Sequence, residues 1–199
     1  MLPEAQVAMN ELVFVGGIHG VGKTSIARRL AEMLPAVHVT AGTLIRETAS
    51  AGHVVTVGVG KKAVPDVDGN QDVLLRGLAS FRGRIGAKQR LLLDGHFCLL
   101  DASGNITEIS LDVFAAMRPA AVLLVTAEPE TVHARLMQRD AESPPLDVVA
   151  QLSNREEARA VEVSTALSIP MWTVRGDIEL EVAARSAAAH LRSCLTGAA

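Results

Sequence analysis

A glycine-rich segment that ends in a lysine and a threonine is the part of this sequence best suited to chemistry. Gly17-Ile-His-Gly-Val-Gly-Lys23-Thr24 fits the pattern G-x-x-x-x-G-K-[ST] of a phosphate-binding loop. Glycines let successive backbone N–H groups turn toward an anion, and a helix that begins there points the positive end of its dipole at the same place. The loop predicts binding of ATP, with Lys23 on the β- and γ-phosphates and the Thr24 hydroxyl on Mg²⁺. The residues expected to hold ATP are Gly17, His19, Gly20, Val21, Gly22, Lys23, Thr24 and Ser25.

A single acid follows the apolar segment Leu91-Leu-Leu. At the carboxyl end of a parallel strand, Asp94 would lie where open α/β sheets bind ligands, close enough to hold a Mg²⁺ water or the catalytic lysine. The alternative is an aspartate that caps a helix or forms a turn. His96, two residues on, would be a base if the phosphoryl acceptor is a hydroxyl, and otherwise a hydrogen-bonded structural residue. Its expected place is in the acceptor site.

Two pairs of arginines have the spacing of neighbours on a helix face. Arg135 and Arg139 lie four residues apart, and Arg155 and Arg159 repeat the interval beyond the break at 140–145. Such pairs on either side of a flexible connection suit a lid that closes over transferring phosphates. We expect Arg139 and Arg155 to act in catalysis with Lys23 and Asp94, and Arg135 to bind the nucleotide. The alternative is four solvated surface arginines.

A third candidate region follows the second predicted strand. In Thr40-Ala-Gly42-Thr-Leu-Ile-Arg46, the glycine permits close approach of a ligand at a helix start, and Arg46 one turn later could grip an acceptor phosphate. A solvated helix arginine is the ordinary alternative. The segment 51–70 is rich in glycine and is expected to be a mobile excursion from the core. Within and just after it, Asp66, Asp68, Asn70 and Gln71 are interpreted as turn-formers, or as readers of a ribose or base edge.

Apolar runs alternate with amphipathic segments along the whole chain, which predicts a parallel sheet covered by helices on both faces. One domain over 1–199 is expected, with an acceptor-binding insertion at about 40–72 and a short lid at about 139–148. The predicted strands are 11–16, 36–39, 90–94, 120–126 and 170–174, with a hairpin of 97–100 and 106–109. The predicted helices are 23–34, 41–50, 71–88, 111–117, 130–139, 146–167 and 179–195.

Composition narrows the class of protein. The net charge of −3 and the aromatic content of 3% make nucleic acid an unlikely partner. Cys98 and Cys194 form no disulfide framework, which fits a reducing compartment. No apolar run reaches membrane-spanning length and the first residues lack a basic leader, so we expect a cytoplasmic protein without a membrane partner.

With these residues in hand, the chain resembles nucleoside monophosphate kinases, most closely adenylate kinases of the archaeal-type branch. The resemblance rests on Gly17–Thr24, Gly42–Arg46, Leu93–His96, Pro119–Glu130, Arg135–Asp140 and Asn154–Glu156. It implies the three-layer α/β/α sandwich of P-loop kinases with a five-stranded parallel sheet, and transfer from MgATP to a nucleoside monophosphate. It also implies that Gly42 and Arg46 bind the acceptor and that Arg175, after the last strand, lies at the adenine.

The chain departs from that family in three places. No Pro-Arg pair follows Asp94-Gly-His-Phe97, the lid is short, and 53–70 match no acceptor-site pattern. Three hypotheses therefore stay open. The first is transfer to a nucleoside monophosphate. The second is a kinase of another small metabolite that carries a hydroxyl. The third is a regulatory ATPase that acts through a protein partner, with 53–70 and 97–109 as docking surfaces. The sequence leaves the oligomeric state open.

Overall fold

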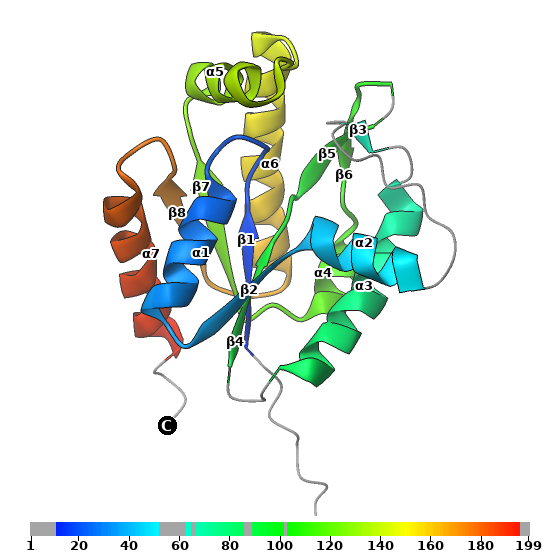
Figure 1. Cartoon of the computed structure of the whole chain (residues 1–199), viewed down its shortest axis with the longest axis vertical. Coiled ribbons are helices and arrows are strands. Elements are labelled where there is room, and N and C mark those ends of the chain that lie inside the picture. The colour runs from blue at the N-terminus through cyan, green and yellow to red at the C-terminus, as the bar shows by residue number, and fades with distance from the viewer. Residues whose placement is uncertain (1–10, 52–62, 65–66, 86–88, 102, 196–199) are drawn as a thin grey trace, which may run out of the picture.

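A central sheet of five parallel strands organises the molecule in the computed structural model (Figure 1), which describes residues 11–51, 63–64, 67–85, 89–101 and 103–195. The strand order is β2-β4-β1-β7-β8. Every residue of β1 is buried, as expected for a strand with helices on both faces. The predicted five-stranded parallel sheet is therefore confirmed. The strands are β1 (Leu12–Gly16), β2 (Ala36–Thr40), β4 (Arg90–Asp94), β7 (Ala121–Thr126) and β8 (Met171–Arg175).

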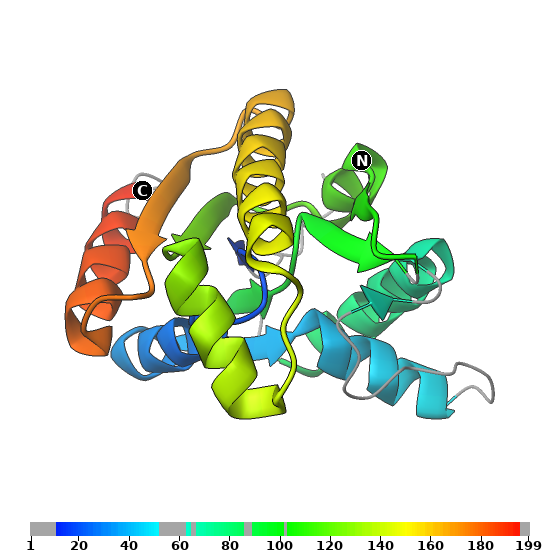
Figure 2. The same ribbon diagram turned by 90° about the horizontal axis from the view of Figure 1, so that it is seen from above.

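Helices form the two outer layers. The helices α1 (Lys23–Met33) and α7 (Leu180–Leu195) pack together on one face, and α6 (Leu146–Ala166) and α4 (Leu111–Met117) lie on the other (Figure 2). The helix α5 (Pro129–Asp140) lies above the carboxyl ends of the strands in Figure 1 and packs against α6. The arrangement is the three-layer α/β/α sandwich. Within the described ranges, no helix has the length and apolar character needed to cross a membrane.

A second, smaller sheet lies beside the first. The predicted hairpin is present as β5 (Cys98–Asp101) antiparallel to β6 (Ile106–Glu108). Its turn is closed by the Asp101 carboxylate, which accepts hydrogen bonds from the backbone N–H groups of Ser103 and Asn105. The short strand β3 (Ala63–Val64) pairs in parallel with β5. This strand falls within the segment 51–70, which was expected to be a mobile excursion, and it was not among the predicted strands.

The helix α3 (Val67–Arg84) corrects a second expectation. It begins four residues before the predicted start at 71, so Asp68, Asn70 and Gln71 are helical and do not form a turn; Asp66 lies outside the described residues. The helix packs against α2 (Ala41–Ala51), which contacts α3 extensively. Gly77 makes the approach possible, because a Cβ there would lie 2.5 Å from the Thr48 hydroxyl.

Three phenylalanines form the core beneath the glycine-rich loop. Phe14 of β1 meets Phe97 and Phe114 edge-on at centroid distances of 5.0 and 5.2 Å, and Phe97 stacks on Phe114 at 5.0 Å. Gly16 lies against this cluster, and a Cβ there would come within 2.2 Å of the Phe97 ring. The glycine at the end of β1 thus lets the segment after β4 pack directly under the loop.

Candidate active site

The loop between β1 and α1 has the backbone shape of an anion cradle. Gly17, Gly20 and Gly22 have φ angles of 139°, 87° and 103°, values that side-chain-bearing residues rarely adopt. Gly17 also lacks room for a side chain, since a Cβ would lie 2.3 Å from the Val125 carbonyl oxygen. The helix α1 begins at Lys23 without a side-chain cap. The loop and the helix N-terminus therefore direct N–H groups at one point, where an anion can bind.

Lys23, Thr24 and Asp94 come together because β1 and β4 are neighbouring parallel strands, with Val15 paired to Asp94. The Thr24 hydroxyl donates a 2.6 Å hydrogen bond to Asp94 Oδ2. Lys23 is 6% exposed, and its Nζ donates to the Ile18 carbonyl at 2.9 Å. The predicted cluster of lysine, hydroxyl and carboxylate is thus present in space at the carboxyl edge of the sheet.

Lys23 and Asp94 affect each other's pKa values because they are buried close together. Burial lowers the pKa of Lys23, while Asp94 and Glu156 oppose that shift. Burial would raise the pKa of Asp94, but His38, Lys23 and Thr24 outweigh it and hold the pKa below its usual value. The His38 Nε2 lies 3.7 Å from Asp94 Oδ2. Asp94 is therefore a carboxylate at neutral pH, available to a metal-bound water or to Lys23.

A cavity of about 430 Å³ opens above the loop. Arg135 and Arg139 of α5 line its other side, as predicted from their spacing. Arg135 Nη1 donates to the carbonyls of Gly20 and Val21 at 3.2 and 3.4 Å, so it is attached to the loop itself. Arg139 is exposed and pairs with Asp140 at 2.8 Å. The remaining wall is apolar and comes from the start of α7. The cavity joins a phosphate cradle to a cationic wall and an apolar wall.

Two histidines meet beside this region, of which His19 lines the cavity and His96 does not. The rings of His19, in the loop, and His96, after β4, lie 4.2 Å apart. His19 is accessible from the cavity yet surrounded by protein, and this desolvation, with the charges of Lys23 and Arg139, lowers its pKa to about 4. Burial, with Lys23 and His19, lowers the pKa of His96 well below the usual value. Both rings are therefore neutral at pH 7 and add no positive charge, and their lowered pKa values make them weak bases.

A sequence profile of the AAA domain family matches residues 16–153, about two thirds of the chain, from the end of β1 into α6.

The chain belongs to the AAA domain family.

Solved structures of three kinases have a similar architecture. A sugar kinase from Janibacter sp. HTCC2649 has a TM-score of 0.54 and 16% identity, covering 92% of this chain and 95% of its own. A gluconokinase from Sinorhizobium meliloti 1021 has a TM-score of 0.53 and 16% identity, covering 96% and 97%. A shikimate kinase from Aquifex aeolicus vf5 has a TM-score of 0.58 and 12% identity, covering 94% and 99%. At these identities the likeness shows a shared P-loop kinase fold. No curated protein matches the chain.

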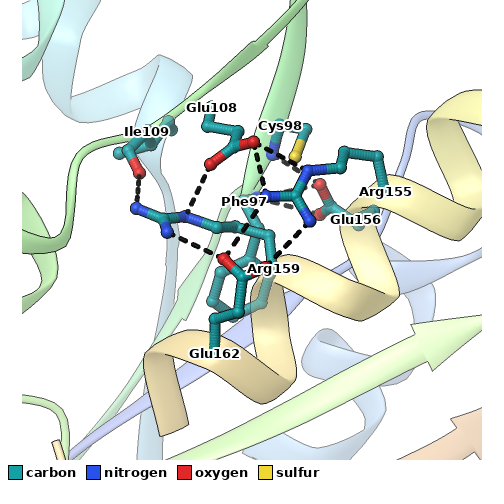
Figure 3. Close-up of polar contacts among 8 residues, drawn as sticks. All are labelled: Phe97, Cys98, Glu108, Ile109, Arg155, Glu156, Arg159 and Glu162. Atoms are coloured by element: carbon teal, nitrogen blue, oxygen red, sulfur yellow. Dashed lines mark hydrogen bonds and ion pairs between the residues drawn. The ribbon is translucent and has the colours of Figure 1, made fainter. Parts of the chain in front are cut away.

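Arg155, two residues beyond the matched range, lies elsewhere than expected. It does not line the cavity with Arg139; its guanidinium donates to Glu108 of β6 at 2.7 Å and to Glu162 of α6 at 2.9 Å (Figure 3). Arg159 has a similar place, since it donates to Glu162 and to the Ile109 carbonyl, both at 2.9 Å. The reason is the orientation of α6 about its own axis, which directs these arginines toward the hairpin. The structure thus separates the two predicted arginine pairs.

The remaining predicted residues do not line the large cavity. Arg46 is exposed on the first turns of α2, with Nη2 3.4 Å from the Thr43 hydroxyl. A Cβ on Gly42 would make an ordinary contact with the Thr40 hydroxyl at 3.9 Å. Their role in acceptor binding stays a prediction. Arg175 does not line the large cavity, because it pairs with Asp177 and Glu128. The next residue, Gly176, does line it.

Glu156 is the site residue whose contacts were not foreseen. It is 2% exposed, and its carboxylate accepts hydrogen bonds from the backbone N–H of Gly17 at 2.8 Å, of Phe97 at 2.9 Å and of Cys98 at 2.6 Å. Burial raises its pKa to about 7 despite these bonds. A sequence signal exists, because the apolar residues Val149, Leu152, Ala160 and Val163 recur at helical spacing and position 156 falls in the same series.

Proposed function

We propose that this protein transfers the γ-phosphoryl group of MgATP to a small metabolite. The observation that carries the proposal is the cluster of Lys23, Thr24 and Asp94 beneath the cavity, faced by Arg135 and Arg139. An ammonium, a hydroxyl, a carboxylate and two guanidinium groups around an N–H cradle are the parts that phosphoryl transfer requires. The P-loop kinase fold of the similar sugar kinase, gluconokinase and shikimate kinase supports the same reaction type.

Each residue has a definite task in this proposal. The loop N–H groups and Lys23 bind the β- and γ-phosphates. Arg135 braces the loop through its carbonyls and lines the nucleotide cavity. Arg139 releases Asp140 and neutralises charge that spreads over the transferring group. Because the cradle and the ammonium are fixed before the nucleotide arrives, little reorganisation is needed during the reaction.

Thr24 and Asp94 fit the requirements of Mg²⁺. A hydroxyl and an ionised carboxylate are hard oxygen donors, and the 2.6 Å contact places them side by side. These two residues would hold the ion, Thr24 directly and Asp94 through water. When bound, Mg²⁺ supplies charge neutralisation on the phosphate oxygens.

For the acceptor we propose a nucleoside monophosphate, with Gly42 and Arg46 of α2 at its phosphate. The strand β2 pairs with β4, so α2 begins beside the strand end that carries Asp94. An acceptor phosphate is itself a nucleophile and requires no side-chain base.

A second acceptor class, a metabolite with a hydroxyl, is favoured by the placement of Arg155. The ion pairs of Arg155 with Glu108 and Glu162 leave fewer cations for a second phosphate. His96 or Asp94 would then take the hydroxyl proton. The proteins of similar fold named above include kinases of this acceptor class.

An acceptor panel tests the proposal. The protein would be incubated with radiolabelled ATP, Mg²⁺ and either nucleoside monophosphates or hydroxyl acceptors such as gluconate, shikimate and nucleosides. Label should move to one acceptor class, and Lys23→Met should abolish the transfer. ATP hydrolysis that every acceptor leaves unchanged would contradict a kinase and favour a regulatory ATPase.

A further inference from the structure

The carboxylate of Glu156 connects three parts of the molecule at one buried point. One oxygen accepts a hydrogen bond from Gly17, the first loop glycine. The two oxygens also accept hydrogen bonds from Phe97 and Cys98, where the chain leaves β4 for the hairpin (Figure 3). Among the described residues, all its hydrogen-bond donors are backbone N–H groups. A charge that is 2% exposed is costly to bury without such bonds, so this arrangement requires an explanation.

The neighbouring arginines of α6 do not take part in these hydrogen bonds. Arg155 and Arg159 are directed toward Glu108 on the outer side of the hairpin, whereas Glu156 is directed inward (Figure 3). One helix therefore holds the hairpin by ion pairs and the loop by a carboxylate. Since α6 packs against α5, whose Arg135 binds the loop carbonyls, the loop is held from both sides.

Gly17 in turn lies against the catalytic lysine. A Cβ on Gly17 would be 3.4 Å from Cδ of Lys23, so the glycine backbone forms one side of the channel for the lysine stem. The negative charge of Glu156 also raises the pKa of Lys23 and so partly offsets the lowering caused by burial. A change at the carboxylate therefore reaches Lys23 both through packing and through the electric field.

We propose that Glu156 is a positioning residue for the phosphate loop, which fixes the Gly17 N–H and thereby aims Lys23 at the phosphates of ATP. This inference rests on the proposed function, since it concerns nucleotide binding at the same loop. The carboxylate binds no nucleotide atom itself. It acts by holding the loop in the shape that binds phosphate before ATP arrives.

The positioning depends on the ionised form. A protonated carboxyl must place an O–H among three N–H donors, so at least one of these hydrogen bonds is lost. The pKa of Glu156, raised by burial to about 7, puts this loss within the neutral range. Lys23 of α1 and the Cys98 thiol of β5 are the titratable groups that interact with the charge of Glu156; Glu108 of β6 and Arg155 and Arg159 of α6 act on the Cys98 thiol beside it. Of the charged side chains, Lys23 has the largest effect on the pKa of Glu156.

The test compares two adjacent positions on α6. Glu156→Gln removes the charge and sets an amide NH₂ against an N–H donor, whereas Glu157→Gln makes the same change at the exposed neighbour. Amide NMR would follow Gly17, Phe97 and Cys98 between about pH 6 and about pH 8.5, and calorimetry would measure the affinity for ATP with Mg²⁺ over the same range. Thermal unfolding would establish that each variant is folded.

The wild-type protein and Glu157→Gln should show one common midpoint near pH 7 for the three amides. Their affinity for ATP should fall about tenfold or more as Glu156 becomes protonated. In Glu156→Gln the amides should not titrate, and ATP should bind weakly at every pH. The wild-type titration carries the test even if Glu156→Gln does not fold.

Two results would overturn the proposal. Amides that do not titrate in the wild-type protein would show that the carboxylate does not hold the loop. Amides that titrate while ATP affinity stays constant would show a purely structural carboxylate. In both cases ATP binding by the wild-type protein would leave the proposed function intact. Absence of ATP binding to the wild-type protein at every pH would overturn the proposed function together with this role.

Discussion

Replacement of Lys23 by methionine should strongly reduce kcat while changing the free energy of unfolding little. Lys23 is 6% exposed, and its Nζ meets only the Ile18 carbonyl at hydrogen-bond distance among the described residues. In the reaction we propose, that ammonium turns to the phosphate oxygens. Loss of one preorganised donor of this kind costs about 3–4 kcal/mol at the transition state, or about 10²–10³ in kcat.

Stability should respond much less than activity. Methionine leaves the Ile18 carbonyl without its donor, which costs about 1–3 kcal/mol. It also removes a buried ammonium whose pKa is lowered by desolvation, and this gain offsets the loss. We expect the free energy of unfolding to change by about 1 kcal/mol or less. The pKa of Asp94 should rise, since Lys23 helps to hold it down.

The assay is phosphoryl transfer under saturating ATP and Mg²⁺, with denaturant unfolding measured on the same preparations. Arg28→Met is the matched control, because it removes an exposed cation from the same helix. Its kcat should equal that of the wild-type protein. A Lys23→Met variant that keeps kcat within about threefold would refute the reasoning, and so would one that loses activity only because it unfolds.

Three further predictions follow from other contacts. Arg155→Ala should leave the KM for ATP unchanged, because the partners of Arg155 are Glu108 and Glu162. Loss of these exposed ion pairs should lower the unfolding temperature slightly. A loss of kcat of about a hundredfold would instead indicate that Arg155 acts on the phosphates. Arg46→Ala should raise the KM of the acceptor about tenfold and leave that of ATP alone, and steady-state kinetics with each substrate varied would expose the opposite pattern. Because burial raises the folded-state pKa of Glu156 from 4.5 to about 7, its contribution to stability should be greatest below about pH 4.5 and should decline up to about pH 7. Between these pH values, the free energy of unfolding of the wild-type protein should therefore decrease relative to that of Glu156→Gln. If denaturation experiments give both proteins the same pH dependence of stability, the pKa of Glu156 is not raised.

The sheet and the glycine-rich loop could be predicted from the sequence because local patterns determine them. Apolar runs such as 12–15 and 121–125 are fully buried, and the loop glycines have the positive φ angles that their residue type permits. The meeting of Thr24 and Asp94 was also predictable. Once the strands are parallel, their carboxyl ends share one edge of the sheet.

The arginines show where local reasoning ends. Arg155 and Glu156 are adjacent, so their side chains leave α6 about 100° apart, and only the rotation of the helix decides which one faces the loop. The buried positions Leu152, Ala160 and Val163 place Glu156 inward and Arg155 toward the hairpin. Spacing of arginines alone carries no information about that rotation, which is set by tertiary packing.

The start of α3 and the strand β3 were missed for a related reason. Polar residues such as Asp68 and Asn70 favour turns in isolation, yet they also suit the first turn of a helix. In the folded protein they lie in the first turn of α3. Pairing of Ala63 and Val64 with β5 joins segments distant in sequence, and no local pattern predicts it.

Calorimetric titration with ATP in the presence of Mg²⁺ tests most directly whether the loop from Gly17 to Thr24 binds a nucleoside triphosphate. We predict binding at one site, with weaker affinity in Lys23→Met and unchanged affinity in Arg28→Met. Absence of binding by both ATP and GTP to the folded wild-type protein would contradict the account at its foundation.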